Sequence, residues 1–353
     1  KGCLDLSLFK KTINKISNRV LWQLYGYFIQ RDIMDDYRII RLKTGKLKMI
    51  SPLQPISTEA SIDTIISIID IIKVEFQNRY SKFKIGKVEE AMKKVPLPLN
   101  MRSASDGTQL PFGTRIPLGD VDYLRFGVHW FNEEEGIPTD IDLSGVFYGD
   151  YFSYSREIGW YSDYQTVFSV FSGDLVNAPK PHGAAEFIDV ELNEAYLSGL
   201  PYVAIFLNLF AGNSFETSHA VINAQRIESL DDDLRDIAMN GEAFEPARLL
   251  FSTPIKKCSD IKQMLVCLID TENKEVIWID MPKVTRLLSA EYGLGSCSKS
   301  DVATTGDMIQ AFISRTQPSL FELYSFFEYD PKLPDVSWAN KSPYDLSGVM
   351  GFL

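Results

Sequence analysis

The first part of the chain, residues 1–94, carries apolar side chains at helical spacing. These side chains recur every three or four positions, which is typical of helices with one buried face: Leu4, Leu8, Ile13, Ile16, Val20, Leu21, Leu24 and Phe28. The isoleucine-rich stretch 62–76 predicts a further buried helix, and the flanks of the Lys-Thr-Gly turn at 43–45 predict a short hairpin over 38–42 and 46–50. We therefore expect a mostly helical N-terminal region.

Residues 95–120 contain many turn formers and no sustained apolar period. Proline, glycine, serine and aspartate cluster in the stretch VPLPLNMRSASDGTQLPFGTRIPLGD. These residues favour turns and loops, because each restricts or relaxes the backbone in a way that regular elements do not tolerate. We expect a linker here.

Residues 121–283 change to short apolar or alternating runs, separated by Asp, Gly, Asn and Pro. Evenly spaced short strands of this kind favour a β-sandwich. The predicted strands are Tyr123–Phe131, Ser144–Tyr148, Thr166–Val170, Glu186–Leu192, Tyr202–Leu209, Arg248–Ser252, Met264–Ile269 and Glu275–Ile279.

The tail, residues 284–353, returns to helical patterning. Val302–Ser314 and Ser319–Tyr329 read as helices with Pro318 between them. The expected fold class is therefore mainly β, with a β-sandwich over 121–283 that is flanked by helical segments, α+β overall.

Composition narrows the class of protein. Apolar residues make up 45% and charged residues 24% of the 353 positions, which indicates a folded globular chain and excludes a disordered acidic tail. Four cysteines without a CxxC pair argue against a zinc ribbon. Three dispersed histidines argue against a histidine-built zinc hydrolase.

Charge divides the chain into a basic front and an acidic body. Residues 1–100 hold 18 basic and 10 acidic residues, a net of +8, and the remainder holds 36 − 18 = 18 basic and 47 − 10 = 37 acidic residues, a net of −19. Two readings stay open: parts that dock on each other, or a basic surface over residues 10–48 that binds nucleic acid. Lys10, Lys11, Lys15 and Arg19 fall partly along one face of the first helix.

We expect no membrane span, because the most apolar stretch, 62–76, is short and interrupted by Asp63, Asp70 and Lys73. Nothing in the chain marks an oxidising compartment, so we expect a cytoplasmic protein with reduced thiols. Cys258 and Cys267, nine residues apart, are the one pair close enough in sequence to suspect of a disulfide.

Acidic residues are the candidates for chemistry. Asp140 and Asp142 are two positions apart, so on a strand both carboxylates point to one face, where they repel unless a cation lies between them. Asp163, Asp174 and Glu186 follow downstream. Hard oxygen ligands drawn from several loops are what Ca²⁺ prefers. The alternative is that these residues are turn formers and solvated strand ends.

Three segments within residues 121–283 resemble the TerD family of tellurite-resistance and stress proteins. They are RFGVHWFNEEEGIPTDIDLSGVFYGD, GWYSDYQTVFSVFSGDLVNAPKPHGAAEFIDVEL and YVAIFLNLFAGNSFE. The resemblance implies a β-sandwich that binds calcium through its acidic loops.

Matched position by position, Asp140 and Asp142 stand where the family has its Asp-Leu-Asp pair. Asp163 stands at the second Asn after Tyr, Asp174 in the Gly-Asp loop, and Glu186 in the acidic loop. Ser162 and Leu175 depart from the pattern, since each replaces an asparagine.

Three functions follow from these observations. The first is a non-enzymatic, calcium-binding stress or defence protein that acts through protein partners. The second is a structural module of a larger assembly whose metal site has decayed. The third is a metal-assisted hydrolase, which ranks last because no base, nucleophile or oxyanion group can be named near the carboxylates.

Overall fold

A computed structural model describes most of the chain and divides it into two compact units. Unit 1 comprises residues 1–41, 48–114 and 311–353, and unit 2 comprises 42–47 and 115–310. The described residues are 6–31, 38–41, 47–50, 59–99, 110–133, 138–231, 234–240, 242–255, 261–282 and 316–337, with positions 310, 313, 349, 352 and 353.

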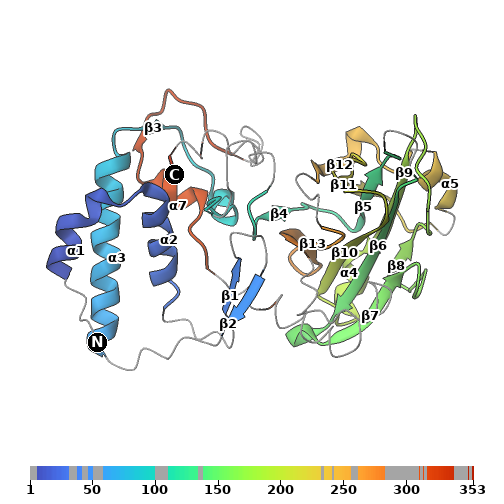
Figure 1. The fold of residues 1–353 in the computed structure, drawn as a ribbon, viewed down its shortest axis with the longest axis horizontal. Helices are drawn as coiled ribbons and strands as arrows, with labels where there is room; N and C mark the ends of the chain where they lie inside the picture. Colours follow the sequence, from blue (N-terminus) through green and yellow to red (C-terminus); the bar gives the residue numbers. More distant parts are fainter. Residues whose placement is uncertain are drawn as a thin grey trace. The chain divides into compact units, whose positions relative to one another are not determined.

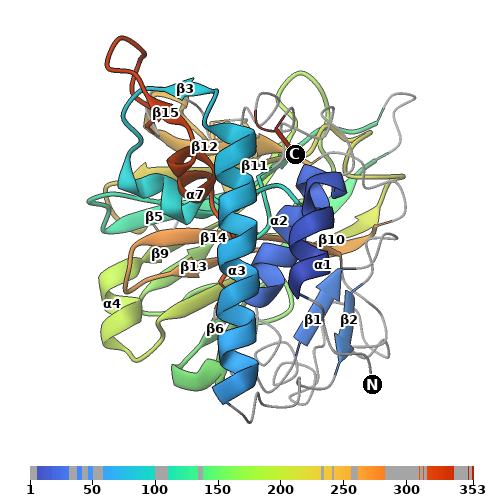
Figure 2. The same ribbon diagram turned by 90° about the vertical axis from the view of Figure 1, so that its left-hand side faces the viewer.

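Unit 1 is built around a long helix, α3, along which α1 and α2 lie (Figures 1 and 2). Its isoleucine-rich sequence is helical from Glu59 to Tyr80, as the apolar pattern predicts. The described helical elements of this unit are α1 (Leu6–Thr12), η1 (Ile13–Lys15), α2 (Asn18–Phe28), α3 (Glu59–Tyr80), η2 (Glu90–Lys94) and α7 (Leu320–Ser325). Two pairs of short strands accompany them: β1 (Arg38–Arg41) with β2 (Leu47–Ile50), and β3 (Lys84–Ile85) with β15 (Glu328–Tyr329).

Aromatic side chains fill the core of unit 1. Trp22 of α2 is fully buried and stacks on Phe76 of α3, with ring centroids 3.9 Å apart. Its indole nitrogen donates a hydrogen bond to the hydroxyl of Tyr80, and that hydroxyl donates to the carbonyl of Phe352. The buried polar ends of these rings are therefore satisfied inside an apolar core.

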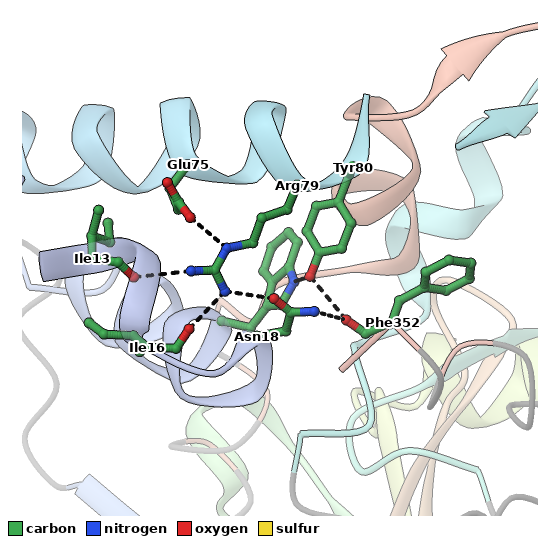
Figure 3. Close-up of polar contacts among 8 residues, drawn as sticks. Ile13, Ile16, Asn18, Glu75, Arg79, Tyr80 and Phe352 are labelled. Atoms are coloured by element: carbon green, nitrogen blue, oxygen red, sulfur yellow. Dashed lines mark hydrogen bonds and ion pairs between the residues drawn. The ribbon is translucent and has the colours of Figure 1, made fainter. Parts of the chain in front are cut away.

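One guanidinium group joins three helical segments of unit 1 (Figure 3). Arg79 of α3 donates to the carbonyls of Ile13 and Ile16 at 3.0 and 2.8 Å, and to Oδ1 of Asn18 at 2.7 Å. Its Nε also pairs with Glu75 at 2.7 Å. The fork of donors thus satisfies carbonyls where α1 and η1 end and α2 begins, which fixes the turn between them.

Unit 2 consists of two antiparallel sheets. The six-stranded sheet has the order β4-β14-β13-β10-β6-β7, and the five-stranded sheet has the order β12-β11-β5-β9-β8 (Figure 1). The strands are β4 (Arg115–Pro117), β5 (Tyr123–Trp130), β6 (Asp140–Tyr148), β7 (Tyr154–Gly159), β8 (Ser169–Phe171), β9 (Ala184–Glu191), β10 (Tyr202–Ala211), β11 (Val221–Ile227), β12 (Leu249–Pro254), β13 (Gln263–Asp270) and β14 (Glu275–Pro282). Short helices lie between them: η5 (Asp150–Phe152), α4 (Leu192–Leu197), α5 (Arg235–Met239) and η6 (Pro246–Arg248).

The two sheets pack closely where β6 faces β9. A Cβ on Gly145 of β6 would meet the end of the Ile188 side chain of β9 at 3.0 Å, closer than ordinary van der Waals contact, so a glycine favours this close approach. Every residue of β6 is buried. This close contact brings the polar residues of β6 and β9 together inside the sandwich.

The predicted fold class is confirmed: unit 2 is a β-sandwich, and helices lie near both ends of the chain. Strands β3, β4, β7, β11 and β15 are additional to the sequence expectation, and β6 begins at Asp140 rather than at Ser144. Of the two expected tail helices, Ser319–Tyr329 is helical only over α7, Leu320–Ser325, and its end forms strand β15 instead. Val302–Ser314 lies almost wholly outside the described residues.

Among the described residues, none of the helices combines the length and the apolar character that crossing a bilayer requires. Cys267 is a buried free thiol on β13. Because Cys267 is free, the suspected Cys258–Cys267 disulfide is not formed. Cys3, Cys258 and Cys297 themselves lie outside the described residues.

Candidate metal centre

Two carboxylates lie at the start of strand β6. Asp140 and Asp142 lie on the same face, because side chains alternate along a strand. Their exposed fractions are only 6% and 7%. Asn208 lies opposite Asp142 on β10 and donates from Nδ2 to Oδ2 of Asp142 at 2.8 Å. One oxygen of Asp142 is therefore held in place by the neighbouring strand.

The third carboxylate comes from the segment between β8 and β9. Asp174 follows Gly173, whose φ of +102° belongs to the region that favours glycine. One ligand atom from each of Asp140, Asp142 and Asp174 lies within 4.8 Å of the others. The glycine turn thus carries Asp174 to the aspartate pair on β6.

Two oxygens of this group are buried without a partner. Oδ1 of Asp140 and Oδ1 of Asp174 have no hydrogen bond. A buried acceptor that makes no hydrogen bond is rare in folded proteins, because it forfeits its hydration. Both oxygens lie in a group of acidic side chains, and a bound cation would satisfy them.

Burial and repulsion between neighbouring carboxylates raise the pKa values of Asp140 and Asp142. Burial, followed by the charges of Asp142 and Asp174, raises the pKa of Asp140 to about 7. Burial also raises the pKa of Asp142, against the hydrogen bond from Asn208, and Asp174 adds to the rise. A divalent cation would reverse this cost, because it favours the ionised carboxylates.

A fourth acidic residue, Glu186, lies on the opposite sheet and contacts the backbone next to Asp142 and Asp174. It is a fully buried residue of β9. Its Oε2 accepts from the backbone N–H of Leu143 at 2.7 Å, and its Oε1 accepts from the N–H of Leu175 at 2.9 Å. Burial raises its pKa well above the usual value, although both backbone hydrogen bonds act in the opposite direction. The two carboxylate oxygens are thus engaged by main-chain donors.

The remaining acidic candidate, Asp163, and the buried Asp189 do not belong to the group of three aspartates. Asp163 is exposed, and its backbone bridges to Ile158 on the turn after β7. Asp189 of β9 is fully buried and forms a two-bond ion pair with Arg125 of β5, at 2.8 and 2.7 Å. The structure therefore brings together Asp140, Asp142 and Asp174. Glu186 binds the backbone beside two of them.

Asn208 is the contributor to the site that the sequence did not indicate. It is a polar residue within the apolar strand YVAIFLNLFA, and this interruption was the available signal. An amide inside such a strand needs a polar partner, and Asp142 provides it.

The donor set fits a hard divalent cation. All three gathered side chains offer carboxylate oxygens, with no thiolate or imidazole among them. Ca²⁺ takes six to eight such oxygens in flexible geometry, whereas Mg²⁺ demands a tighter octahedron. Asp140, Asp142 and Asp174 would hold the ion, and water or main-chain carbonyls would complete its coordination.

Neither a protein-family model nor a curated protein matches the chain. Solved structures that resemble it include a homologue of the telluride resistance protein TerD, SCO6318 from Streptomyces coelicolor A3(2). It is 10% identical with a TM-score of 0.34, covering 50% of this chain and 99% of that one. A protein of unknown function, SAV2460, is 14% identical with a TM-score of 0.34, covering 53% and 97%. We therefore base the function on the side chains of the site.

Proposed function

We propose that unit 2 is a divalent-cation-binding module, with calcium as the favoured ion. The observation that carries this proposal is the convergence of Asp140, Asp142 and Asp174 within 4.8 Å, with two buried oxygens that have no partner. Buried like charges are unfavourable without a compensating cation, and oxygen-only donors select calcium over softer metals. The resemblance of the sequence motifs to the TerD family agrees with this choice.

We further propose that the module acts by binding protein partners in a stress or defence response, without catalysing a reaction. Among the described residues, the group of ligands that could surround the ion consists of three aspartates, without a histidine or cysteine that would supply a base or nucleophile. The stress or defence role rests on the sequence resemblance. A calcium ion held by these aspartates then serves to order the loop that carries Asp174.

A second candidate is a structural module whose metal site has decayed. The observations that favour it are the exposed position of Asp163 and the apolar Leu175, whose side chain is buried beside Asp174. In that case the remaining aspartates would not bind calcium measurably. The two candidates are separated by the effect of calcium on stability.

The test is thermal unfolding of the full chain with calcium, with magnesium and with a chelator. Calcium should stabilise the native state by about 2.7 kcal/mol at 100 times its dissociation constant. Asp142→Asn should abolish most of this gain, because it keeps the shape of the side chain and removes the charge. Asp150→Asn changes an exposed aspartate beyond the other end of β6 and is the matched control.

If calcium leaves the melting temperature of the wild type unchanged, the cation-binding proposal is wrong and the structural module is favoured. If Asp150→Asn lost the calcium response as fully as Asp142→Asn, the response would not arise from the three aspartates.

A further inference from the structure

Glu186 connects the two segments that carry the aspartates. The N–H of Leu143, which it binds through Oε2, belongs to the peptide bond directly after Asp142. The N–H of Leu175, which it binds through Oε1, belongs to the peptide bond directly after Asp174. One carboxylate of β9 therefore fixes the backbone next to two of the three aspartates.

The connection crosses the sandwich. Asp142 and Leu143 belong to β6 of the six-stranded sheet, while Glu186 belongs to β9 of the five-stranded sheet. The described pairing of β6 with β7 ends at Ser144. Leu143 directly precedes that residue, and the N–H of Leu143 donates to Glu186 of the other sheet. The segment of Asp174 is held to β9 at Ser172, whose N–H donates to the carbonyl of Phe187, and the N–H of Leu175 joins it to Glu186 directly beside Asp174.

We infer that Glu186 is a positioning residue of the cation site, which holds the segments of Asp142 and Asp174 at the ion rather than coordinating it. This inference rests on the proposed function. Replacing a group that orients the ligands of a metal typically weakens metal binding 10- to 100-fold. Here each oxygen of Glu186 already accepts a main-chain hydrogen bond of 2.9 Å or less.

Removing one acceptor tests the inference. In Glu186→Gln one oxygen becomes an amide nitrogen, which cannot accept from a backbone N–H. Either the peptide N–H after Asp142 or the one after Asp174 then loses its acceptor. The calcium dissociation constant, measured by titration calorimetry on the full chain, should rise roughly 10- to 100-fold.

The second readout separates a positioning residue from a ligand. Terbium replaces calcium, and its luminescence lifetimes in H₂O and D₂O count the water molecules on the ion. Glu186→Gln should leave that count unchanged at saturation, whereas Asp142→Asn, which weakens a ligand, should raise it. Glu191→Gln, on the same strand and half-exposed, is the matched control and should alter neither affinity nor water count.

The outcomes are distinct. An additional water in Glu186→Gln would make Glu186 a ligand and overturn the inference alone, as would an unchanged calcium affinity. Absence of calcium and terbium binding in the wild type would overturn the proposed function, and the positioning role with it.

A measurement on the wild type covers the case in which Glu186→Gln does not fold. Couplings across the hydrogen bonds, from the amide nitrogens of Leu143 and Leu175 to the carboxylate carbon of Glu186, should be present without calcium and persist after its addition. Their loss on addition of calcium would mean that Glu186 turns to the ion, and the inference would be wrong.

Discussion

At Asp140, burial and two neighbouring carboxylates act on one group in the same direction. The pKa rises to about 7 from an ordinary value of 3.8, because burial penalises the charge and Asp142 and Asp174 repel it. The folded protein without cation therefore binds more protons at this position than the unfolded protein does. Ionisation of Asp140 thus opposes folding until a cation is bound.

Because the pKa of Asp140 is raised in the folded state, the stability of the cation-free protein should depend on pH. Stability contributed by neutral Asp140 is present at low pH and should be lost as the pH rises from about 4 to about 7. Urea unfolding in the presence of a chelator, compared with Asp140→Asn, measures it. The stability of the wild type relative to the variant should fall over this range. A difference that stays constant from pH 4 to pH 8 would refute the assignment.

The buried pair of Arg125 and Asp189 makes the second prediction for single residues. Both side chains are buried, and the guanidinium also lies over the ring of Phe187 at 3.9 Å. Asp189→Asn would leave the cation of Arg125 buried without its partner, so it should lower the stability of unit 2 by about 3–5 kcal/mol. Chemical unfolding measures the loss.

The matched control is Asp122→Asn, which removes an exposed ion pair with Lys274 and should change the stability little. Equal losses in the two variants would contradict the role assigned to burial.

Sequence alone indicated some of the site residues for a physical reason. Asp140 and Asp142 share a face because strand periodicity is local, and the structure shows that they do. The role of Glu186 was not predictable in this way. It depends on which backbone donors lie opposite β9 across the sandwich, and that is set by the packing of two sheets rather than by neighbouring sequence.

At the scale of elements, the two longest strands that were missed, β7 and β11, are rich in polar residues. β7 reads YSREIG and has three exposed residues at its start, so it shows no apolar run. β11 reads VINAQRI and buries Asn223 and Gln225. Polar residues in these strands find partners in the folded protein, and local patterning does not reveal those partners.

The isoleucine-rich helix was predictable because its apolar period is long, but its polar anchor was not. Arg79 reaches carbonyls in the segment that precedes α2 and the side chain of the first residue of α2, all more than sixty positions away in sequence. A lysine has a single ammonium group and cannot reproduce the planar fork.

Arg79→Lys should therefore lower the stability of unit 1 by roughly 1–3 kcal/mol, because buried carbonyls lose their donors. Urea unfolding monitored by circular dichroism at helical wavelengths measures the change. Lys73→Arg, an exposed position on the same helix, is the control and should have little effect. If both variants unfold at the urea concentration of the wild type, Arg79 does not join these segments.

At the scale of the molecule, the order of helical and β segments was predictable and their assembly was not. The segment after residue 316 packs into the N-terminal core: Leu323 is buried there, and β15 pairs in parallel with β3. The backbone around Pro334 leaves no room for a Cβ on Gly86. Contacts between segments about 240 positions apart depend on the whole fold, so sequence periodicity carries no information about them.

The basic charge of the N-terminal region leaves one predicted function untested, which is binding to nucleic acid. Lys10, Lys11 and Lys15 are exposed, as a basic surface over residues 10–48 requires. Binding to nucleic acid through these residues stays a prediction, as do the domain boundaries after residues 94, 120 and 283 and the cytoplasmic location. If these lysines do bind nucleic acid, affinity should fall steeply with salt.

The central claim is that three aspartates of unit 2 hold one divalent cation. A crystal structure of the full chain grown with calcium, with anomalous diffraction data, tests it most directly. We predict one anomalous peak, with oxygens of Asp140, Asp142 and Asp174 at about 2.3–2.6 Å from it. Crystals that contain calcium and show no peak among these three carboxylates, or show the carboxylates dispersed, would contradict the claim.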